Sequence, residues 1–196
     1  MALPRFAVVD LETSGLSTRW NRILQIGMVT VEADGAVVDE WSTLVKMRWP
    51  LQRVGPTHVH GITRSSLKGA PPLDTVLAEF GRRLDGAIFT AHNAEFDGGF
   101  LQRAARRRPL DDPIRRSLEH PLCTLRMSRR LDPERQRSHR LGDLCEHYGV
   151  ALDRPHDALC DAAATAAGSP RLLDELGITD VGELEPFYRS LSPRTS

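Results

Sequence analysis

The sequence predicts an α/β fold around a mixed β-sheet, because short apolar segments with strand character come first and then alternate with amphipathic helical segments. The chain has 196 residues, 40% of them hydrophobic and 27% charged, which fits one globular domain with a core of its own. No segment reaches the roughly 20 apolar residues that a membrane-spanning helix needs, so no membrane association is expected.

Three strands are expected first. Residues 6–9 are apolar and rich in β-branched side chains, and this strand should end at Asp10. Residues 23–31 and 37–45 have the same character, and the Glu-Ala-Asp-Gly segment at residues 32–35 between them fits a hairpin turn. These segments predict an antiparallel meander.

A fourth strand and several helices should follow. Residues 57–69 are polar and turn-rich, apolar residues then recur with helical spacing, and residues 87–91 have strand character. The expected helices span residues 73–84, 94–107, 122–131, 141–148, 158–173 and, before a tail, about 184–191. The Ala-rich helix at residues 158–173 should pack closely against the sheet.

The charge is unevenly distributed. The formal net charge is zero, so the field of the whole molecule gives no reason to expect nucleic acid binding. Residues 101–140, however, contain 12 arginines and 5 acidic residues, and this local excess could attract phosphates. The alternative is a solvated helix surface, because only 2 of the 26 basic residues are lysine and the arginine content looks general.

The three cysteines, Cys123, Cys145 and Cys160, are far apart and form no Cys-x-x-Cys pair. The N-terminus runs directly into the first strand, without the layout of a signal peptide. These features indicate a cytoplasmic protein with reduced thiols, some of them in the core.

Acidic residues stand at the end of the first strand. Side chains alternate across a strand, so Asp10 and Glu12 should project from one face while Leu11 faces the other. Two adjacent carboxylates repel each other unless a cation lies between them, and Mg²⁺ prefers such oxygen ligands. The alternative is a strand end with two solvated acids.

Two later segments carry further acids. The segment AHNAEFD at residues 91–97 leads from a strand into a helix, and Asp97 falls near the start of that helix, where the helix dipole alone favours an acid. In HDALCD at residues 156–161, Asp157 can cap the next helix, and Asp161 lies one turn later on the same face. His156 either swings over a site or is an incidental surface group.

Together, the segments FAVVDLETSGL, AHNAEFD and HDALCDA resemble, in sequence and in order, the DnaQ-like exonucleases in their histidine-bearing form, DEDDh. The resemblance runs from about residue 6 to residue 167. It implies a ribonuclease H-like fold, with three antiparallel N-terminal strands in a mixed sheet flanked by helices. It further implies two divalent ions, Mg²⁺ or Mn²⁺, a general base at His156, and four metal-binding carboxylates: Asp10, Glu12, Asp97 and Asp161.

The resemblance also implies contacts with the substrate. Thr13 would hold the terminal nucleotide, with Leu16 as an apolar wedge against the base. His60 belongs to the segment VHGIT, similar to an element that lies over the terminal sugar and base, although it also fits a polar loop. Asn93 and Phe96 would position the scissile region, or Phe96 belongs to the core. Trp20 either stacks on a base or is a half-buried anchor of its loop, and we favour the anchor.

The implied activity is metal-dependent 3′–5′ hydrolysis of single-stranded nucleic acid, DNA in the first instance, with release of nucleoside 5′-monophosphates. One alternative is an exoribonuclease or oligoribonuclease. Another is a polymerase-associated nucleotide-binding module, whose sign would be a missing carboxylate or histidine. We assign residues 1–174 to the exonuclease domain and residues 175–196 to a helical extension and tail. That short extension favours a free-standing enzyme over one docked on a DNA polymerase.

Overall fold

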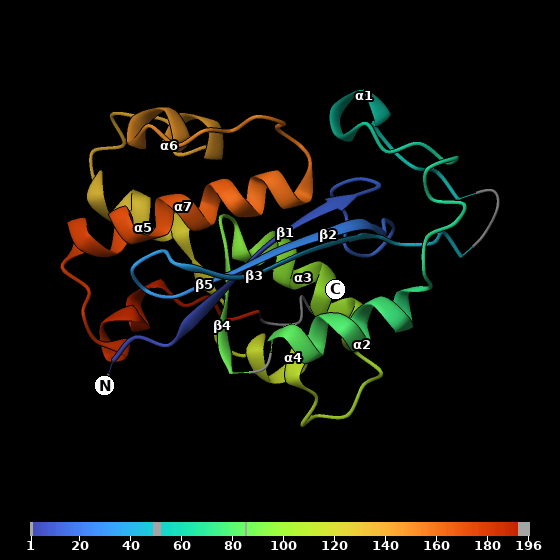
Figure 1. Cartoon of the computed structure of the whole chain (residues 1–196), viewed down its shortest axis with the longest axis horizontal. Coiled ribbons are helices and arrows are strands. Elements are labelled where there is room, and N and C mark those ends of the chain that lie inside the picture. The colour runs from blue at the N-terminus through green and yellow to red at the C-terminus, as the bar shows by residue number, and fades with distance from the viewer. Residues whose placement is uncertain (1, 49–51, 85, 192–196) are drawn as a thin grey trace.

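The computed structural model describes residues 2–48, 52–84 and 86–191, and it shows a five-stranded sheet with helices on both faces (Figure 1). The strand order is β3-β2-β1-β4-β5. The strands are β1 Arg5–Thr13, β2 Ile23–Val31, β3 Val37–Leu44, β4 Ala87–Ala91 and β5 Leu122–Cys123. This arrangement confirms the predicted mixed sheet.

The first three strands form the expected meander. β2 pairs antiparallel with both β1 and β3, whereas β4 runs parallel to β1 and β5 runs parallel to β4. In the turn between β2 and β3, the N–H of Glu32 donates to the carbonyl of Ala36 at 2.9 Å. Strand β1 continues past the expected end at Asp10 to Thr13, so Asp10 and Glu12 lie within it. Because β1 and its parallel neighbour β4 end at the same edge of the sheet, these acids lie close to the acidic segment that follows β4.

Helices cover both faces of the sheet. The helices are α1 Thr57–His60, α2 Leu73–Leu84, α3 Ala94–Ala105, α4 Pro113–Ser117, α5 Thr124–Leu131, α6 Leu141–Tyr148, α7 Ala158–Leu176 and the 3-10 helix η1 Val181–Phe187. The core on one face includes side chains of α2, α3 and α4, and the core on the other includes side chains of α5, α7 and η1. In Figure 1, α6 lies outside α7.

Strand β1 is buried on both faces, and the alternation of its side chains determines the face to which its acids point. Val9 packs into the core beside α2 and α3, whereas Val8 packs into the core beside α7. The side chains of Asp10 and Glu12 lie on the same face of the strand as that of Val8. Both acids are therefore directed to the face of the sheet that α7 covers.

Two expected helices are wrong in part. At residues 122–131, Leu122 and Cys123 pair with β4 as strand β5, and only the remainder is helical. Both side chains are buried, and this burial at the sheet edge outweighs the helical pattern. Near the C-terminus, a 3-10 helix that contains Pro186 replaces the helix expected at residues 184–191, because proline has no N–H to continue an α-helix.

Short helices occur where irregular chain was expected. Helix α1 is a single turn within residues 57–69, and α4 begins at Pro113. The carboxylate of Asp112 caps α4 by accepting the N–H of Ile114 at 3.0 Å. Helix α7 continues beyond residue 173 to Leu176.

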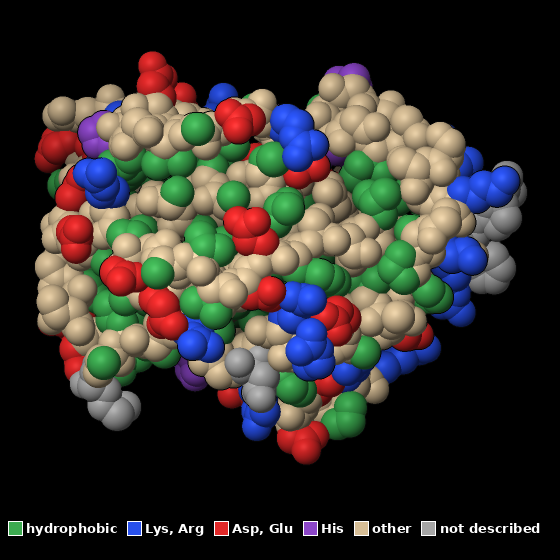
Figure 2. All heavy atoms as spheres, viewed as in Figure 1, with side chains coloured by type: hydrophobic (Ala, Val, Ile, Leu, Met, Phe, Trp, Pro, Cys, Tyr) green, Lys and Arg blue, Asp and Glu red, His purple; other side chains and the backbone are tan. Residues whose placement is uncertain are grey.

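The molecular surface is mixed in charge. Figure 2 shows acidic and basic side chains interspersed over the viewed face, in keeping with the formal net charge of zero. Among the described residues, no helix is long and apolar enough to cross a membrane. The three cysteines are free thiols, and Cys123 and Cys145 are buried.

Candidate functional site

The end of β1 lies directly beneath the first turn of α7. In the sheet register, Asp10 lies opposite Gly27 of β2, and Glu12 lies opposite Gln25. A Cβ atom at Gly27 would fall 2.2 Å from the carbonyl of Ala158. Only glycine permits this approach, because any side chain would displace the helix start. The helix therefore begins against the strand that flanks both acids.

Gln25 fastens this helix start to the sheet. Its side-chain amide donates to Oδ2 of Asp157, and its carbonyl oxygen accepts the N–H of Ala158, each at 3.4 Å. Asp157 in turn caps α7, since its Oδ1 accepts the N–H of Cys160 at 3.2 Å. Asp157 therefore serves as the helix cap, as the sequence predicts, and its carboxylate is held by these contacts.

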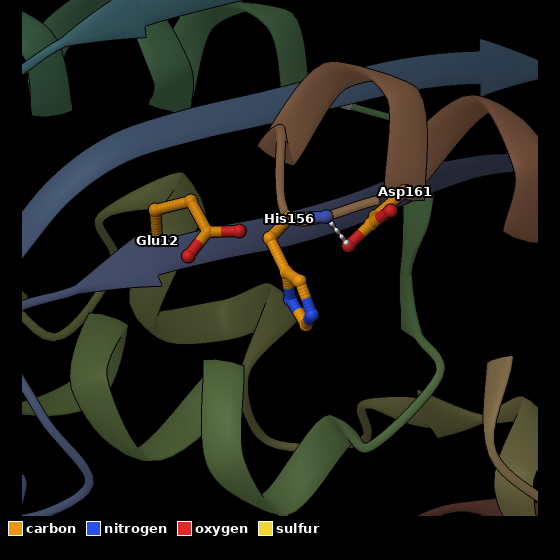
Figure 3. Close-up of side chains that lie close together, drawn as sticks. All are labelled: Glu12, His156 and Asp161. Carbon is orange, nitrogen blue, oxygen red and sulfur yellow. Dashed lines mark hydrogen bonds between the residues drawn. The ribbon is translucent and has the colours of Figure 1, made fainter. Parts of the chain in front are cut away.

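His156 and Asp161 are brought together by an unusual backbone conformation. His156 has a φ of 66°, a left-handed conformation that is uncommon outside glycine. Its N–H donates to Oδ2 of Asp161 at 3.1 Å (Figure 3). Glu12 lies on the other side of His156 in Figure 3, and ligand atoms of Glu12, His156 and Asp161 all lie within 4.8 Å of one another.

Asp97 joins this group from α3. Its side chain is buried, and its Oδ1 accepts the N–H of Leu11 at 3.2 Å. The peptide group of Leu11 lies between the two acids of β1, so this hydrogen bond fixes Asp97 beside them. The pKa of Asp10 is raised well above its ordinary value by burial, and then by the charges of Asp97, Asp161 and Glu12. The four acids are thus close enough to oppose one another's ionisation.

Among the described residues, none of the four acids forms an ion pair with an arginine or a lysine. Burial, followed by the charges of Asp161 and Asp97, raises the pKa of Glu12 to about 8. Burial raises the pKa of Asp97 to about 7, and it also raises the pKa of Asp161. Buried acids in this state favour either protonation or a cation.

A divalent cation fits the residues present. Within the part of the chain that the structure describes, Oδ1 of Asp161 is buried without a hydrogen-bond partner. An unpaired buried carboxylate oxygen is costly unless a ligand completes it. The donors nearby are carboxylate oxygens, with one imidazole, and this set suits Mg²⁺ or Mn²⁺.

A cleft of about 480 Å³ opens beside this cluster. Gln25, His60, Arg154 and His156 are among its lining residues. His60 is buried, its Nδ1 accepts the N–H of Ile62 at 3.0 Å, and its Nε2 is buried without a partner among the described residues. Burial lowers the pKa of His60, so the neutral ring is favoured. His60 therefore reaches the same cleft as His156 from a different loop.

The other residues expected to contact substrate lie in different environments. Thr13 is buried, and its hydroxyl donates to the carbonyl of Gly15 at 2.8 Å. Leu16 is 85% exposed, Asn93 is exposed, and Phe96 is partly buried against Phe100. Asn93 precedes α3 without capping it, so its amide is not used there.

The exposure of Trp20 contradicts the expectation that this residue is a half-buried anchor of its loop. Its side chain is 72% exposed, and the guanidinium of Arg19 lies 4.8 Å from its ring centroid. The loop is held instead by Asn21, whose amide donates to the carbonyl of Ser14 at 3.0 Å. The short polar side chain thus does the anchoring that was expected of the large aromatic one.

Sequence reasoning missed two residues that organise the site. Gly27 interrupts an apolar strand, and an isolated glycine there is a signal for close backbone approach. Gln25 gives no comparable signal. His92 is structural, because its ring nitrogens contact the hydroxyl of Thr124 at 3.1 Å and the carbonyl of His139 at 2.8 Å.

Comparison with protein families and known sequences gives consistent matches. A family model described as an exonuclease matches residues 7–167. PolC-type DNA polymerase III of Streptococcus thermophilus is 38% identical over 161 residues, which cover 82% of this chain and 10% of that protein. The corresponding polymerase of Clostridium perfringens is 32% identical over 192 residues, which cover 94% of this chain and 12% of that protein. The chain spans about a tenth of the length of these relatives.

Solved structures show the same fold. Exonuclease X in complex with 5′-overhanging duplex DNA has a TM-score of 0.68 and 26% identity, with 93% of this chain and 98% of that chain covered. Exonuclease I of E. coli in complex with a dT13 oligonucleotide has a TM-score of 0.73 and 19% identity, with 88% of this chain and 42% of that chain covered. These neighbours confirm the ribonuclease H-like fold. The chain belongs to the DnaQ-like exonuclease family.

Proposed function

We propose that the protein hydrolyses phosphodiester bonds at the 3′ end of single-stranded DNA, one nucleotide at a time, and releases nucleoside 5′-monophosphates. One observation carries this proposal: four acids from β1, α3 and α7 lie beside His156 and oppose one another's ionisation, and among the described residues none of them forms an ion pair with an arginine or a lysine. Such a set is suited to a cation-assisted reaction of a phosphate.

Asp10, Glu12, Asp97 and Asp161 would hold two divalent ions, Mg²⁺ or Mn²⁺. Bound ions of this kind lower the pKa of water and neutralise charge on the attacking and leaving oxygens. The protein contributes rigid positions for the carboxylates. The N–H of Leu11 orients Asp97, and the N–H of His156 orients Asp161.

His156 would accept the proton of the attacking water. Its backbone is tied to Asp161, while the residue itself is exposed and lines the cleft. The imidazole can therefore reach solvent and substrate without a large movement of α7. Imidazole suits this role because it exchanges protons readily near neutral pH.

The cleft would hold the terminal nucleotide. His60, which lines this cleft, is assigned to the terminal sugar and base, and Leu16, which is 85% exposed, is assigned to contact with the base. We assign Thr13, Asn93 and Phe96 to the positioning of the terminal and scissile region, Thr13 through its backbone because its hydroxyl is already used.

DNA is favoured over RNA because the PolC-type relatives are named as DNA polymerases and exonuclease X was solved with duplex DNA. In the PolC-type relatives the matched segment is one part of a polymerase chain, so proofreading beside a polymerase is included in the proposal. We retain residues 1–174 as the exonuclease domain and residues 175–196 as its extension, supported by a family match that ends at residue 167.

A time course on end-labelled single-stranded DNA and RNA of the same sequence tests the proposal. With Mg²⁺ or Mn²⁺, a ladder should advance from the 3′ end of the DNA and vanish with EDTA. Faster digestion of the RNA would transfer the assignment to an exoribonuclease. Internal cuts, or cleavage that resists the chelator, would refute the proposal.

A further inference from the structure

The loop between β1 and β2 packs against α3. It starts where Glu12 and Thr13 end β1, and the N–H of Ser14 donates to the carbonyl of Arg22 at 2.9 Å across its base. Oδ1 of Asn21 accepts the N–H of Ser17 at 2.9 Å. A Cβ at Gly99 of α3 would lie 3.4 Å from Cγ2 of Thr18, so the loop touches the helix there. These contacts stabilise the base of the loop and place Thr18 against α3.

Four arginines lie along this junction. Arg19 and Arg22 come from the loop, while Arg103 and Arg106 follow Gly99 by four and seven residues and so share its face of α3, which ends one residue before Arg106. The pKa of Arg103 is lowered by burial and then by the positive charges of Arg106, Arg22 and Arg19. The four side chains therefore form one cluster, here called the arginine face.

The arginine face has no acidic counterpart. In residues 2–48, 52–84 and 86–191, none of its four arginines forms an ion pair with a carboxylate. Elsewhere the protein does pair arginines, as with Arg108 and Asp112 at 2.5 Å. The excess positive charge of the arginine face is thus available to an external anion.

Apolar side chains project from the same loop. Leu16 is 85% exposed and Trp20 is 72% exposed, with the guanidinium of Arg19 beside the indole ring. Large exposed apolar groups are unfavourable in water and mark binding surfaces when they lie together with charge. An exposed aromatic ring among cations is typical of surfaces that bind single strands, since bases stack and phosphates pair.

The arginine face is also close to the acidic cluster. Arg103 and Arg106 follow Asp97 on α3 by six and nine residues, which corresponds to about 9 and 14 Å along the helix. A strand whose last phosphodiester lay at the acids would reach these arginines within a few nucleotides. The acidic cluster itself repels phosphates, and a nearby basic surface would offset this.

We propose that the arginine face, together with Trp20, binds the sugar-phosphate backbone of the substrate strand several nucleotides upstream of its 3′ end. This rests on the proposed function and adds a substrate class: long strands are preferred over mononucleotide esters and the shortest oligonucleotides. The affinity gained there depends on salt, because each phosphate contact releases counterions.

The test compares two substrates in one double variant, Arg103→Gln/Arg106→Gln. On a long single-stranded oligonucleotide, KM should rise about tenfold, and the slope of log KM against log salt should fall by about 1.4. On the p-nitrophenyl ester of thymidine 5′-monophosphate, kcat and KM should be unchanged, because this substrate is too short to reach the arginine face.

A matched control removes the same charge elsewhere. Arg130 and Arg171 are exposed on α5 and α7, and Arg130→Gln/Arg171→Gln should leave both substrates unaffected. Equal effects of the two double variants, or an unchanged KM in the first, would overturn the proposal. Fluorescence anisotropy of a labelled oligonucleotide in EDTA separates this outcome from failure of the proposed function. Weaker binding by the arginine-face variant alone supports the proposal even in a protein that cleaves nothing.

Discussion

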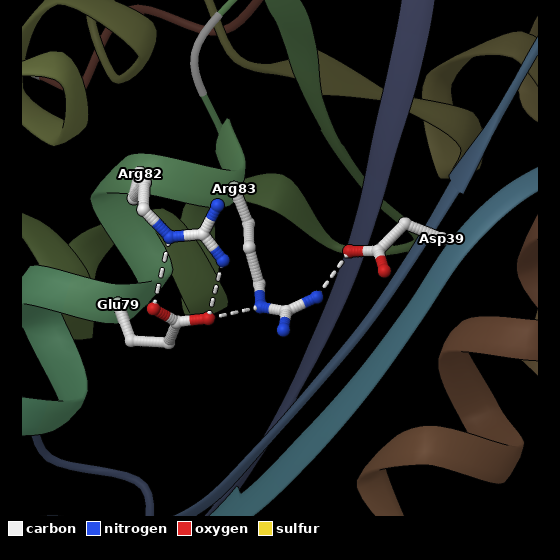
Figure 4. A network of polar contacts seen from close by, with 4 residues as sticks. All are labelled: Asp39, Glu79, Arg82 and Arg83. Atoms are coloured by element: carbon white, nitrogen blue, oxygen red, sulfur yellow. Dashed lines mark hydrogen bonds and ion pairs between the residues drawn. The ribbon is translucent and has the colours of Figure 1, made fainter.

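Two glutamates of this protein have opposite environments. Glu79 on α2 accepts hydrogen bonds from Arg82 and Arg83, and Arg83 extends to Asp39 on β3 (Figure 4). Those contacts lower the pKa of Glu79 to about 2, whereas burial and neighbouring acids raise the pKa of Glu12 to about 8. Among the described residues, arginines form ion pairs with Glu79 but not with Glu12. This difference supports the proposal that the acidic cluster binds a cation.

The largest expected effect follows from removing one acid of the cluster. Asp97→Asn keeps an oxygen that can accept the N–H of Leu11, but it removes a negative charge. Exonuclease activity should fall roughly 10³-fold, which corresponds to about 4 kcal/mol of barrier. Glu79→Gln is the matched control and should retain full activity. A comparable loss of exonuclease activity in both variants would contradict the distinction between the acidic cluster and the ion pairs of Glu79.

Removing the imidazole tests the proposed base. His156→Ala should lower kcat about 10²–10⁴-fold while metal binding and folding are kept. Alanine retains a Cβ at the left-handed φ of 66°, so backbone strain is similar in both proteins. His120→Ala, at an exposed site on another surface, is the control. Undiminished turnover in His156→Ala would exclude this residue as the base.

Stability without metal should fall as pH rises. The folded protein binds protons more tightly than the unfolded chain, because the carboxyl pKa values of Glu12 and Asp97 are raised to about 8 and 7. This contribution is full below the ordinary carboxyl pKa of about 4.5 and is lost as pH rises through about 7–8. Tm measured in EDTA should therefore decrease from pH 5 to pH 8, and Mn²⁺ should restore it at pH 8.

A Tm that stays constant or increases over this range in EDTA would show that the carboxyl pKa values are not raised in the folded protein. Glu12→Gln supplies the control, since its side chain cannot ionise and the decrease should be smaller.

A smaller effect is expected at the link between β2 and α7. Gln25→Ala removes both contacts with the helix start and should lower kcat and Mn²⁺ affinity about fivefold, near 1 kcal/mol. Gln136→Ala, at an exposed loop position, is the control. A decrease in Tm with unchanged kcat and metal affinity would reduce Gln25 to a purely structural role.

The smallest effect is expected at the ion pairs of Glu79 on α2. Glu79→Gln should lower Tm only slightly at pH 7, because exposed ion pairs contribute little. A lowered carboxyl pKa stabilises above the ordinary value and is lost as pH falls toward about 2, so wild type and variant should converge in acid. A Tm difference that persisted at pH 2 would contradict the assigned cause of the pKa shift.

The sequence predicted much of the fold because the informative signals are local. Period-two and helical patterns located β1 to β4, α2, α3, α6 and α7, and they also put Asp10 and Glu12 on one face. Strand β5 was missed, since its two residues are defined by pairing with Thr90 and Ala91 rather than by their own pattern.

The site was less accessible to sequence reasoning where it depends on distant contacts. The three acidic segments were found from their residues and their family resemblance. The contacts that join them, from Gln25 to Asp157 and from Leu11 to Asp97, link positions 132 and 86 residues apart. The exposure of Trp20 was also mispredicted, because apolarity indicates burial only on average.

Calorimetric titration of Mn²⁺ at pH 7, in two buffers of different ionisation enthalpy, tests the central claim most directly. The wild type should bind Mn²⁺ and release protons, because the pKa values of Glu12 and Asp97 lie near or above 7 before the ion binds. Asp97→Asn should bind more weakly and release fewer protons. Absence of saturable binding, or identical binding and proton release in the two proteins, would contradict a metal site built from these acids.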